Sequence, residues 1–301
     1  MDFDVVVVGS LNRDISIFAP RLPQAGESIT GTDHFFGPGG KGANQAVAVA
    51  RLGGRAAMVG RVGDDEHGVA LVSGLESEGV DVSAVTVDDA AGTGLAVITI
   101  DQGAENTIVV SPGANSSLAP FDIERSGALV ASATVVLTQL EVPLEAVEAA
   151  SEIATGIFCI NPAPARDLPT RLMQRVDLLV PNRSELGVLA HSTEPTDVHQ
   201  AVEMAASLDH PGATVVTLGS AGAVLVEDGR AIHVPSPEVQ SVDPTGAGDA
   251  FCGALVYSLS RGSTLEEAVR TAAAAGALAT TRRGAQTAMP TSEEVEALLD
   301  G

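Results

Sequence analysis

The sequence lacks tryptophan, has a single tyrosine, and is only 3% aromatic over its 301 residues. Because 45% of the residues are nevertheless hydrophobic, the core has to be built from aliphatic side chains. Proteins that bind single strands of nucleic acid stack the bases on aromatic rings, so the same scarcity argues against that function.

Basic residues are also scarce. The chain has 16 lysines and arginines against 39 aspartates and glutamates, which gives a formal net charge of −23 at pH 7. Nucleic acids and anionic membranes attract positively charged surfaces, so we expect neither as a partner. The acidic residues are spread along the chain and form no tail, which is typical of a solvated surface.

Only two cysteines occur, Cys159 and Cys252, and their spacing matches neither a metal site nor a redox motif. Both lie within apolar runs, which predicts that they are small core residues. The sequence does not begin with a basic region and a cleavage site, and no apolar run reaches membrane-spanning length. These features predict a cytoplasmic protein.

Several common catalytic motifs are absent as well. No glycine-rich loop ends in Gly-Lys-Ser or Gly-Lys-Thr, no Gly-x-Gly-x-x-Gly follows the first strand, and no serine sits in a nucleophile elbow. The six histidines show no ligand spacing. These absences disfavour a P-loop NTPase, a dinucleotide-dependent dehydrogenase, a serine hydrolase and a zinc enzyme.

What the sequence does contain is an alternation of strands and helices. The first predicted strand, residues 4–9, is aliphatic throughout, as central strands of parallel sheets are. Further strands are expected at residues 56–60, 135–140, 156–160, 177–180 and 213–218, with a hairpin at 223–234. Helices are expected at residues 43–52, 66–78, 143–154, 198–208, 250–259, 265–281 and 292–299. The pattern predicts an α/β fold with a mainly parallel sheet between helices, and a single domain over residues 1–301.

Two segments depart from this alternation. Residues 15–36 have the pattern of short antiparallel strands broken by proline and glycine, and residues 93–111 have that of a hairpin around a polar turn at 101–106. Together they predict a small separate sheet. Because its pieces are interleaved with the main fold, we expect a flap and not an independent domain.

Polar residues repeatedly follow the predicted strands. They are Asn12, Asp14, Glu141, Asn161, Asn182, Glu185, Thr217, Asp243 and Asp249, with Gly219 beside Thr217. Any one of these is more often a loop residue or a helix cap, and Asn182 could simply cap a helix. The carboxyl ends of parallel strands share one edge of a sheet, however, and open α/β sheets bind ligands there.

Two glycine-rich stretches adjoin helices at this edge. Residues 37–44 contain Lys41 between two glycines, and residues 242–251 place Gly246-Ala247-Gly248 before Asp249. Small residues let a ligand approach the backbone, and a helix start attracts anions. A carboxylate there would repel a phosphate. Asp249 is therefore either an ordinary helix cap or a general base beside a phosphoryl group in transfer, and the stretch alone leaves both open.

Residues 39–46, GGKGANQA, resemble the first signature of the ribokinase-like (pfkB) carbohydrate kinases, and residues 243–251, DPTGAGDAF, resemble the second. Between them, further matching pieces occur in the family's order: residues 140–141 (LE), 161–166 (NPAPAR), 181–185 (PNRSE) and 217–222 (TLGSAG). The similarity covers essentially the whole chain. The 161–166 run and residues 283–286 (RGAQ) favour the ribokinase branch of the family.

The resemblance implies a three-layer α/β/α fold with a small β-sheet lid, and ATP-dependent phosphorylation of D-ribose at its 5-hydroxyl. Asp249 would be the general base, and the backbone N–H groups of Gly246, Ala247 and Gly248 would stabilise the group in transfer. The residues implied for sugar binding are Asn12, Asp14, Gly40, Lys41, Asn44, Glu141 and Asp249. Those implied for ATP binding are Asn182, Glu185, Thr217, Gly219, Gly222 and Gly248, with Glu185 near the water shell of Mg²⁺.

The resemblance also implies a monovalent-cation site, usually for K⁺. It would be made by Asp243 and by the carbonyls of Thr245, Ala279, Arg282 and Gly284. The lid, from segments at about 15–36 and 93–111, would pair with a second copy to make a homodimer. Two departures from the family are visible: Ala288 stands where a serine is frequent at the cation site, and residues 272–275 offer adenine no polar group.

Other functions stay open at this point. The substrate could be another pentose such as deoxyribose, a nucleoside, or a sugar phosphate. Scarce aromatic residues disfavour a nucleoside, and a sugar phosphate would need cations near Lys41, where the sequence offers only Arg13. A non-catalytic sugar-binding regulator would be free to lose Asp249 or the Gly-Ala-Gly before it, and both are present.

Overall fold

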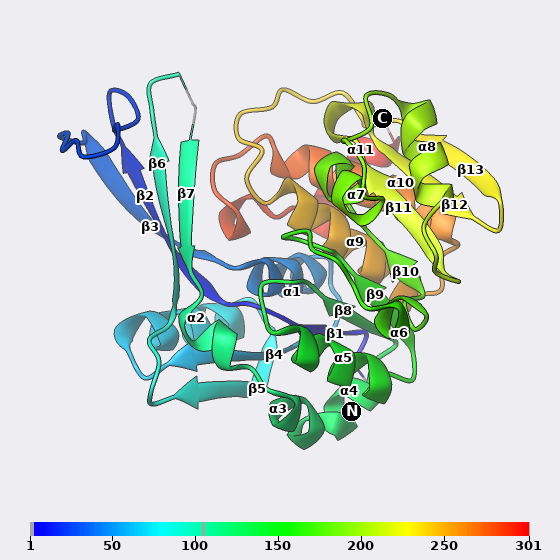
Figure 1. Ribbon diagram of the computed structural model, residues 1–301, viewed down its shortest axis with the longest axis horizontal. Coiled ribbons are helices and arrows are strands. Elements are labelled where there is room, and N and C mark those ends of the chain that lie inside the picture. The colour runs from blue at the N-terminus through cyan, green and yellow to red at the C-terminus, as the bar shows by residue number, and fades with distance from the viewer. Residues whose placement is uncertain (1–2, 104–105, 301) are drawn as a thin grey trace.

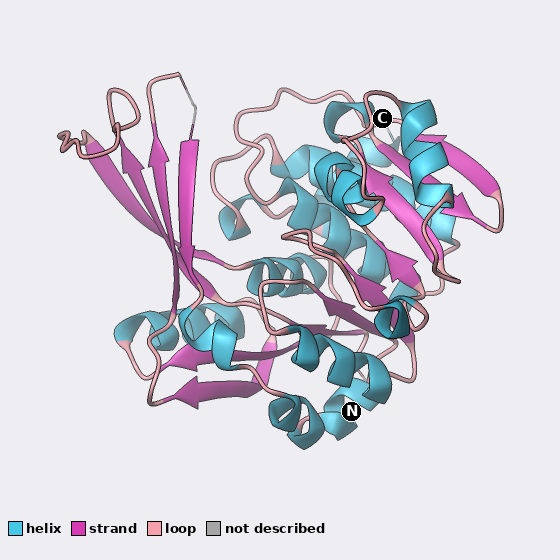
Figure 2. Ribbon diagram, in the orientation of Figure 1, coloured by secondary structure: helices cyan, strands magenta, loops and turns pink. Residues whose placement is uncertain are grey.

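The computed structural model describes residues 3–103 and 106–300, and within them a nine-stranded sheet forms the centre of the molecule (Figures 1 and 2). Its strands, in spatial order, are β13 (Arg230–Val234), β12 (Ala223–Glu227), β11 (Ala213–Thr217), β10 (Leu178–Leu179), β9 (Ile157–Ile160), β8 (Val135–Thr138), β1 (Val5–Val8), β4 (Ala56–Gly63) and β5 (Asp81–Asp88). From β5 to β11 the strands run parallel, and β12 and β13 add an antiparallel edge. The predicted α/β fold with a mainly parallel sheet is confirmed.

Helices cover both faces of this sheet because the central strands are apolar on both sides. In β1, Val5 and Val7 pack into one cluster and Val6 and Val8 into another, all of them fully buried. The first face carries α1 (Lys41–Arg51), α2 (Glu66–Ser77), α9 (Ala247–Ser260), α10 (Leu265–Ala279) and α11 (Ser292–Asp300). The second carries α3 (Pro120–Arg125), α4 (Gly127–Ser132), α5 (Leu144–Ile153), α6 (Thr170–Met173), α7 (Arg183–Leu189) and α8 (Val198–Ala206).

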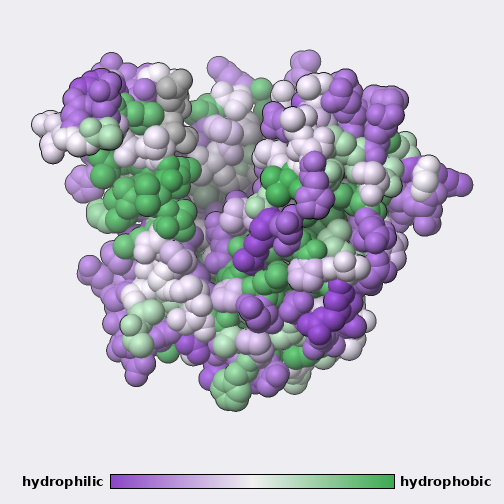
Figure 3. Space-filling model, viewed as in Figure 1, coloured by the Kyte–Doolittle hydropathy of each residue, from purple (hydrophilic) through white to green (hydrophobic). Residues whose placement is uncertain are grey.

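A second, four-stranded sheet stands beside the main body (Figure 1). Its order is β3 (Asp33–Gly39), β2 (Asn12–Phe18), β6 (Gly94–Ile100) and β7 (Asn106–Ser111). The β2–β3 and β6–β7 pairs are antiparallel, whereas β2 and β6 are parallel. Several large apolar side chains of this sheet are exposed, namely Phe35, Phe36, Val97, Ile108, Val109 and Val110, and Figure 3 shows apolar surface over it.

Three short 3₁₀ helices, η1 (Gly113–Ser117), η2 (Gly219–Ala221) and η3 (Gln286–Ala288), complete the described elements. No helix among the described residues is long and apolar enough to cross a membrane. Cys159 and Cys252 are both free and buried, as predicted for small core residues.

The structure differs from the predicted elements at several places. Strand β5 was not predicted, because its sequence DVSAVTVD mixes polar and apolar residues, as suits a half-exposed edge strand. Asn12 and Asp14 belong to β2 and not to a loop, and Gly37 and Gly39 extend β3 in the same way. Helix α9 begins at Ala247, three residues before the predicted start, and α6, a single turn between β9 and β10, was not among the bounded predictions. Residues 104 and 105 of the predicted turn lie outside the described residues.

Candidate active site

The carboxyl ends of the parallel strands bring Asp249 together with residues from distant parts of the chain. Two amide side chains of α1 bind its carboxylate: Asn44 Nδ2 donates to Oδ2 at 2.9 Å, and Gln45 Nε2 donates to Oδ1 at 3.0 Å. Asp249 lies in the first turn of α9, yet its side chain does not cap that helix, because the N-cap residue is Gly246. The alternative that Asp249 is an ordinary helix cap is therefore wrong.

Gly246 gives the start of α9 its shape. Its φ of 78° lies in the left-handed region that favours glycine, and a Cβ there would come within 2.9 Å of the Cα of Ala285. Helix α9 therefore starts on a turn that only glycine fits without strain. Asp249 lies in the first turn of α9. The unpaired N–H groups and the positive dipole end of this helix start would suit a bound anion next to that residue.

Burial raises the pKa of Asp249, since the carboxylate has lost most of its water. The positive charge of Lys41 and the hydrogen bonds from Asn44 and Gln45 act in the opposite direction, and the negative charge of Glu141 adds to the rise. The net effect is a carboxylate that is more basic than usual but still held in place by donors. A general base needs both properties.

The second group of predicted residues lies next to Asp249 on the side of the small sheet. Asn12 is buried, and Asn115 Nδ2 donates to its Oδ1 at 2.8 Å. Burial raises the pKa of Asp14 to about 7, and the neighbouring carboxylates of Glu141 and Asp249 add to the rise. Asp14 and Glu141 are therefore close enough to Asp249 to repel it, which places these three carboxylates in one site.

Glu141 is held from two places, the segment after β1 and the first residue of α1. Ser10 Oγ donates to its Oε2 at 2.5 Å, and the backbone N–H of Lys41 donates to the same oxygen at 3.2 Å. Gly40 makes this turn possible: its φ is 87°, and a Cβ would come within 2.7 Å of the backbone nitrogen of Asn12. The first glycine-rich stretch thus brings the backbone of α1 against the strand end that carries Asn12.

Lys41 provides the positive charge among the acidic groups of the site. Burial acts to lower its pKa, but the charges of Asp249, Glu141 and Glu185 outweigh that effect and raise it. The lysine therefore stays protonated in a largely buried position. Its side chain lines a cavity of about 250 Å³ together with Asn182, Glu185, Gly246, Gly248 and Asp249.

A larger cavity of about 670 Å³ adjoins this one and shares Thr217, Pro244 and Gly248 with it. Of the residues predicted for ATP binding, Thr217, Gly219, Gly222 and Gly248 line it. Phe251, Ala273 and Ala277 supply an apolar wall. The predicted absence of a polar group on this part of α10 agrees with that wall.

Asn182 and Glu185 form a capping box at the start of α7. Asn182 Oδ1 accepts from the N–H of Glu185 at 2.9 Å, and Glu185 Oε2 accepts from the N–H of Asn182 at 2.8 Å. Burial raises the pKa of Glu185; the Asn182 bond and Lys41 oppose the rise, and Asp249 adds to it. Asn182 therefore does cap a helix, as one interpretation of the sequence had it, and it also lines the smaller cavity.

Known proteins match this chain over almost its whole length. The profile of the pfkB family of carbohydrate kinases matches residues 2–292. This chain belongs to that family. It is 36% identical to the ribokinase of Haemophilus influenzae, with 98% of each protein covered, and 34% identical to the deoxyribokinase of Salmonella typhi, also with 98% of each covered. The structure of Arabidopsis thaliana ribokinase complexed with ribose and ATP matches it with a TM-score of 0.91, at 32% identity and with all of both chains covered.

The residues that the family resemblance suggested for a cation lie next to α9. Asp243 Oδ1 accepts from the N–H of Thr245 at 2.9 Å, and its Oδ2 accepts from the N–H of Gly284 at 3.0 Å. Burial acts to raise the pKa of Asp243, but these hydrogen bonds outweigh it and the pKa is lowered. Ala279 ends α10, and the side chain of Arg282 turns away to pair with Glu294. Alanine has no polar side chain, so Ala279 and Arg282 could offer a cation here no more than their backbone carbonyls.

Several residues of the site were missed in the sequence. Gln45, Gln139 and Asn115 are buried and hydrogen-bonded to predicted residues or to each other, and Ser10 holds Glu141. Gln45 stands inside the first signature stretch, so its position beside Asn44 was an available signal. Asn115 and Gln139 carry no such signal, because nothing in their local sequence indicates that they are buried.

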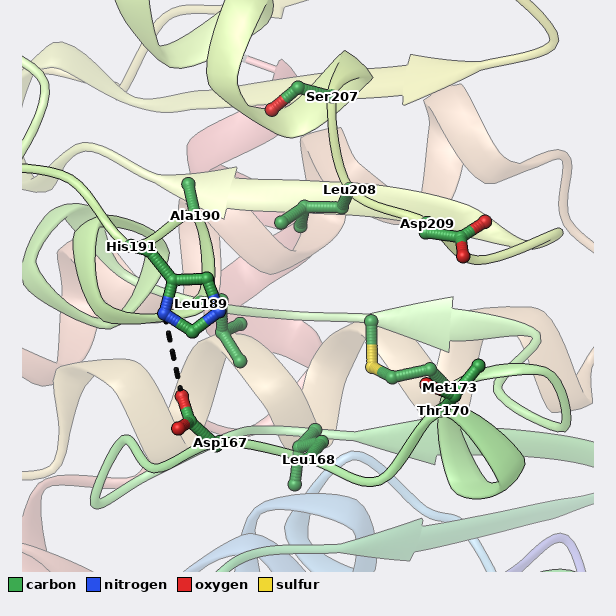
Figure 4. A pocket seen from close by; sticks show the side chains of 10 residues that line it. All are labelled: Asp167, Leu168, Thr170, Met173, Leu189, Ala190, His191, Ser207, Leu208 and Asp209. Carbon is green, nitrogen blue, oxygen red and sulfur yellow. Dashed lines mark ion pairs between the residues drawn. The ribbon is translucent and has the colours of Figure 1, made fainter.

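A further pocket, of about 290 Å³, lies away from this site (Figure 4). It is bordered by the ends of α7 and α8 and by α6, and none of the predicted site residues lines it. Its polar groups include Asp167, His191 and Asp209, and His191 Nδ1 lies 3.7 Å from Asp167 Oδ1. Both members of that pair are largely exposed, so the pocket offers no buried reactive group.

Proposed function

We propose that this protein transfers the γ-phosphoryl group of ATP to the 5-hydroxyl of D-ribose. The observation that carries the proposal is the position of Asp249, a buried carboxylate held by two amide donors at the helix start where two cavities meet. The relatives support the choice of substrates, because the ribokinase of Haemophilus influenzae is 36% identical to this chain, and a ribokinase solved with ribose and ATP has a TM-score of 0.91.

In this reaction Asp249 accepts the proton of the sugar hydroxyl while the hydroxyl oxygen bonds to the γ-phosphorus. The bond between that phosphorus and the β–γ bridging oxygen breaks, and ADP leaves. The raised pKa of Asp249 makes the carboxylate a better proton acceptor near neutral pH. Negative charge on the group in transfer would be stabilised by the N–H groups of Gly246 and Gly248 at the positive end of α9. The N–H of Ala247, also predicted for this role, donates to the carbonyl oxygen of Pro244 at 3.2 Å and would have to leave that partner to take part.

The sugar would lie between the small sheet and α1. Asp14 and Glu141 offer carboxylate oxygens, Asn12 and Asn44 offer amides, and Lys41 offers a donor. Such groups suit a ring with several hydroxyls, because each hydroxyl both donates and accepts. Gly40 keeps the backbone close enough for main-chain contact. Arg13 points to the face of β2 opposite Asn12 and Asp14, and its guanidinium lies over the Phe36 ring at 5.7 Å, so a substrate phosphate would lack that cation.

ATP would occupy the larger cavity, with adenine on the apolar wall of α10 and the phosphates towards Gly248. Thr217, Gly219 and Gly222 line that cavity, and Asn182 and Glu185 lie at its phosphate end in the smaller one. No cluster of three or more metal-binding side chains occurs among the described residues, so Mg²⁺ would enter with the phosphates. Burial disfavours the charged form of Glu185, so a nearby cation would stabilise this carboxylate, which fits a role in holding the water shell of Mg²⁺. Bound Mg²⁺ would supply charge neutralisation on the phosphates.

A K⁺ ion would be held by the loop that joins Asp243 to residues 279–284. The lowered pKa keeps Asp243 charged, and each of its oxygens has a lone pair beyond the N–H that it accepts. The carbonyls of Thr245, Ala279, Arg282 and Gly284 would complete the shell. Because Gly284 also donates to Asp243, a cation there would tighten the loop under the start of α9.

The chain would act as one kinase domain over residues 1–301, with the small sheet as a lid over the sugar. The exposed apolar side chains of that sheet, among them Phe36, Val97 and Val109, would be covered by the lid of a second copy in a homodimer. We expect the enzyme to work in the cytoplasm, where ATP is available, and we expect neither nucleic acid nor membrane as a partner at a net charge of −23.

The experiment is an assay of ADP release with Mg²⁺-ATP and a panel of acceptors: D-ribose, 2-deoxyribose, other pentoses, a nucleoside and a sugar phosphate. We expect the highest kcat/KM with ribose and a higher rate with K⁺ than with Na⁺. The deoxyribokinase relative, at 34% identity, makes 2-deoxyribose the second candidate. Equal release of ADP without any sugar, or none with every sugar, would refute the kinase proposal.

A further inference from the structure

A continuous layer of buried amide side chains lies beneath Asp249. We propose that Gln45, at the centre of this layer, is a positioning residue that fixes the orientation of the Asp249 carboxylate for proton transfer. The inference rests on the proposed kinase function and deepens it, because it names a residue outside both cavities on which catalysis depends.

The contacts of Gln45 use every polar atom of its side chain. It is fully buried in α1, and its Nε2 donates to Asp249 Oδ1 at 3.0 Å and to Asn161 Oδ1 at 3.1 Å. Its Oε1 accepts from Gln139 Nε2 at 2.5 Å. A primary amide has two N–H donors and one carbonyl, so no donor of Gln45 remains free.

The direction of these hydrogen bonds is set by the backbone. Asn161 Nδ2 donates to the carbonyl oxygen of Val180 at 2.9 Å, and a carbonyl can only accept. Asn161 therefore has its Oδ1 towards Gln45, and because that oxygen can only accept, Gln45 has to donate to it with Nε2. Reversing the amide of Gln45 would place its oxygen against two other oxygens, those of Asn161 and Asp249. The main chain after β10 thus determines that Asp249 meets a donor.

This arrangement fixes the plane of the carboxylate. Asp249 Oδ1 is bound by Gln45 and Oδ2 by Asn44, two consecutive residues of α1. Each oxygen keeps a lone pair for a further partner, and Asp249 itself lines the smaller cavity. Gln45 has no exposed surface and lines neither cavity, so any effect on turnover has to pass through Asp249.

Other positions in the chain leave room for the layer. A Cβ at Gly9, the residue after β1, would collide with Gln139 Oε1, so glycine there lets the Gln139 side chain pass beneath the site. Gln139 follows β8 and Asn161 follows β9, which places one amide at each of two neighbouring strand ends. Two amide oxygens of this layer, Gln139 Oε1 and Asn44 Oδ1, have no hydrogen-bond partner among the described residues. Buried amides that are only partly paired are costly in a core, which suggests a use beyond packing.

The test replaces Gln45 by methionine, which keeps the length of the side chain and removes both donors. We expect kcat with ribose to fall roughly tenfold to a hundredfold, as for a lost hydrogen bond to a charged group. The KM for ribose should stay within about threefold, because Gln45 does not reach the cavity. The acidic limb of kcat should move to higher pH by about one unit, since the charged form of Asp249 loses a donor.

The groups that face Asp249 are the same in wild type and variant. They are Lys41 on α1, Asp14 on β2, Glu141 after β8, Glu185 on α7 and the Cys252 thiol on α9. A shift of the limb between the two proteins therefore reports the lost amide. A purely structural role for Gln45 would lower the melting temperature and the active fraction without moving the limb.

Thr138→Val is the matched control. Thr138 is fully buried in β8, the strand that precedes Gln139, and its hydroxyl has no hydrogen-bond partner among the described residues, so replacing that hydroxyl by a methyl group of similar size breaks no hydrogen bond and should leave kcat within about twofold. Gln139→Met, which removes only the donor to Gln45, should give a smaller fall of about threefold to tenfold and serves if Gln45→Met does not fold. Unchanged kcat and pH profile in both glutamine variants would overturn the inference. An inactive wild type would instead refute the proposed kinase function.

Discussion

Replacing Asp14 by asparagine should make the protein more stable at pH 8 while abolishing ribose binding. Burial raises the pKa of Asp14 to about 7, helped by the charges of Glu141 and Asp249, against 3.8 in an unfolded chain. Between these two pH values the folded protein holds a proton that the unfolded chain has released. The folded state therefore binds more protons, and its stability falls as the pH rises through this window.

The size of the effect follows from the difference in pKa. About three pKa units at 1.36 kcal/mol each give roughly 4 kcal/mol of destabilisation above pH 7, as an upper value. Asp14 keeps some contact with water, so we expect about 2 to 3 kcal/mol. Asparagine carries no charge and escapes this penalty. The stability difference between variant and wild type should widen by about 2 kcal/mol from pH 5 to pH 8.

Urea unfolding of both proteins at pH 5, 6, 7 and 8 measures this difference. The control is Asp65→Asn, because burial acts to raise the pKa of Asp65 but hydrogen bonds from Thr93 and Gly68 outweigh it and lower the pKa. That carboxylate stabilises the fold above the unfolded pKa, so its loss should destabilise throughout the same range. Ribose at a hundred times its Kd should stabilise the wild type by about 2.7 kcal/mol and leave Asp14→Asn unchanged. A pH-independent difference, or an Asp14→Asn protein less stable at pH 8, would refute the electrostatic reasoning.

Three further predictions concern catalysis, the helix start and assembly. Asp249→Asn should lower kcat by roughly 10²- to 10⁴-fold in the ADP-release assay while calorimetry still detects ribose binding, and near-normal turnover would remove Asp249 as the base. Gly246→Ala should cost more stability in urea than Gly262→Ala, because both have positive φ but only Gly246 would bring a Cβ against Ala285; equal losses would contradict this. Light scattering should show that Val109→Asp, at a side chain 70% exposed on the small sheet, dissociates the proposed homodimer, whereas Val69→Asp, 69% exposed on α2, does not. A monomeric wild type would refute the assembly.

Much of the fold could be predicted from the sequence because its signals are local. A strand such as Val5–Val8 is aliphatic throughout, and this identifies it as central without knowledge of its neighbours. Strand β5 escaped prediction because its burial depends on a neighbour, β4, that only the assembled sheet provides. The parallel pairing of β2 with β6 was missed for the same reason, since it joins segments about eighty residues apart.

Some residues of the candidate site could likewise be predicted from the sequence, and others could not. A carboxylate beside a glycine-rich helix start drew attention to Asp249, the shared edge of the sheet pointed to the polar strand ends around it, and the family resemblance then assigned the roles. Gln139 could not be predicted, because it falls inside the predicted strand at residues 135–140 with no local sign of a role, and it becomes significant only when its amide is seen against Gln45. Which carboxylates would have a raised pKa was equally hidden, since that depends on burial and on like charges brought close by folding.

The charges of the site link substrate binding to the stability of the fold. Asp14, Glu141, Glu185 and Asp249 share one region with the single ammonium group of Lys41, and burial opposes the charge on three of these carboxylates. Sugar hydroxyls would supply hydrogen-bond donors to some of these groups, and Mg²⁺ with the nucleotide would supply positive charge to others. Each substrate would therefore reduce the repulsion between these carboxylates, which destabilises the folded protein when no substrate is bound. Burial is the main cause of the raised pKa of Asp249, and the charge of Glu141 adds to it, so the same loss of water that destabilises the charged, substrate-free site also makes this carboxylate a better proton acceptor.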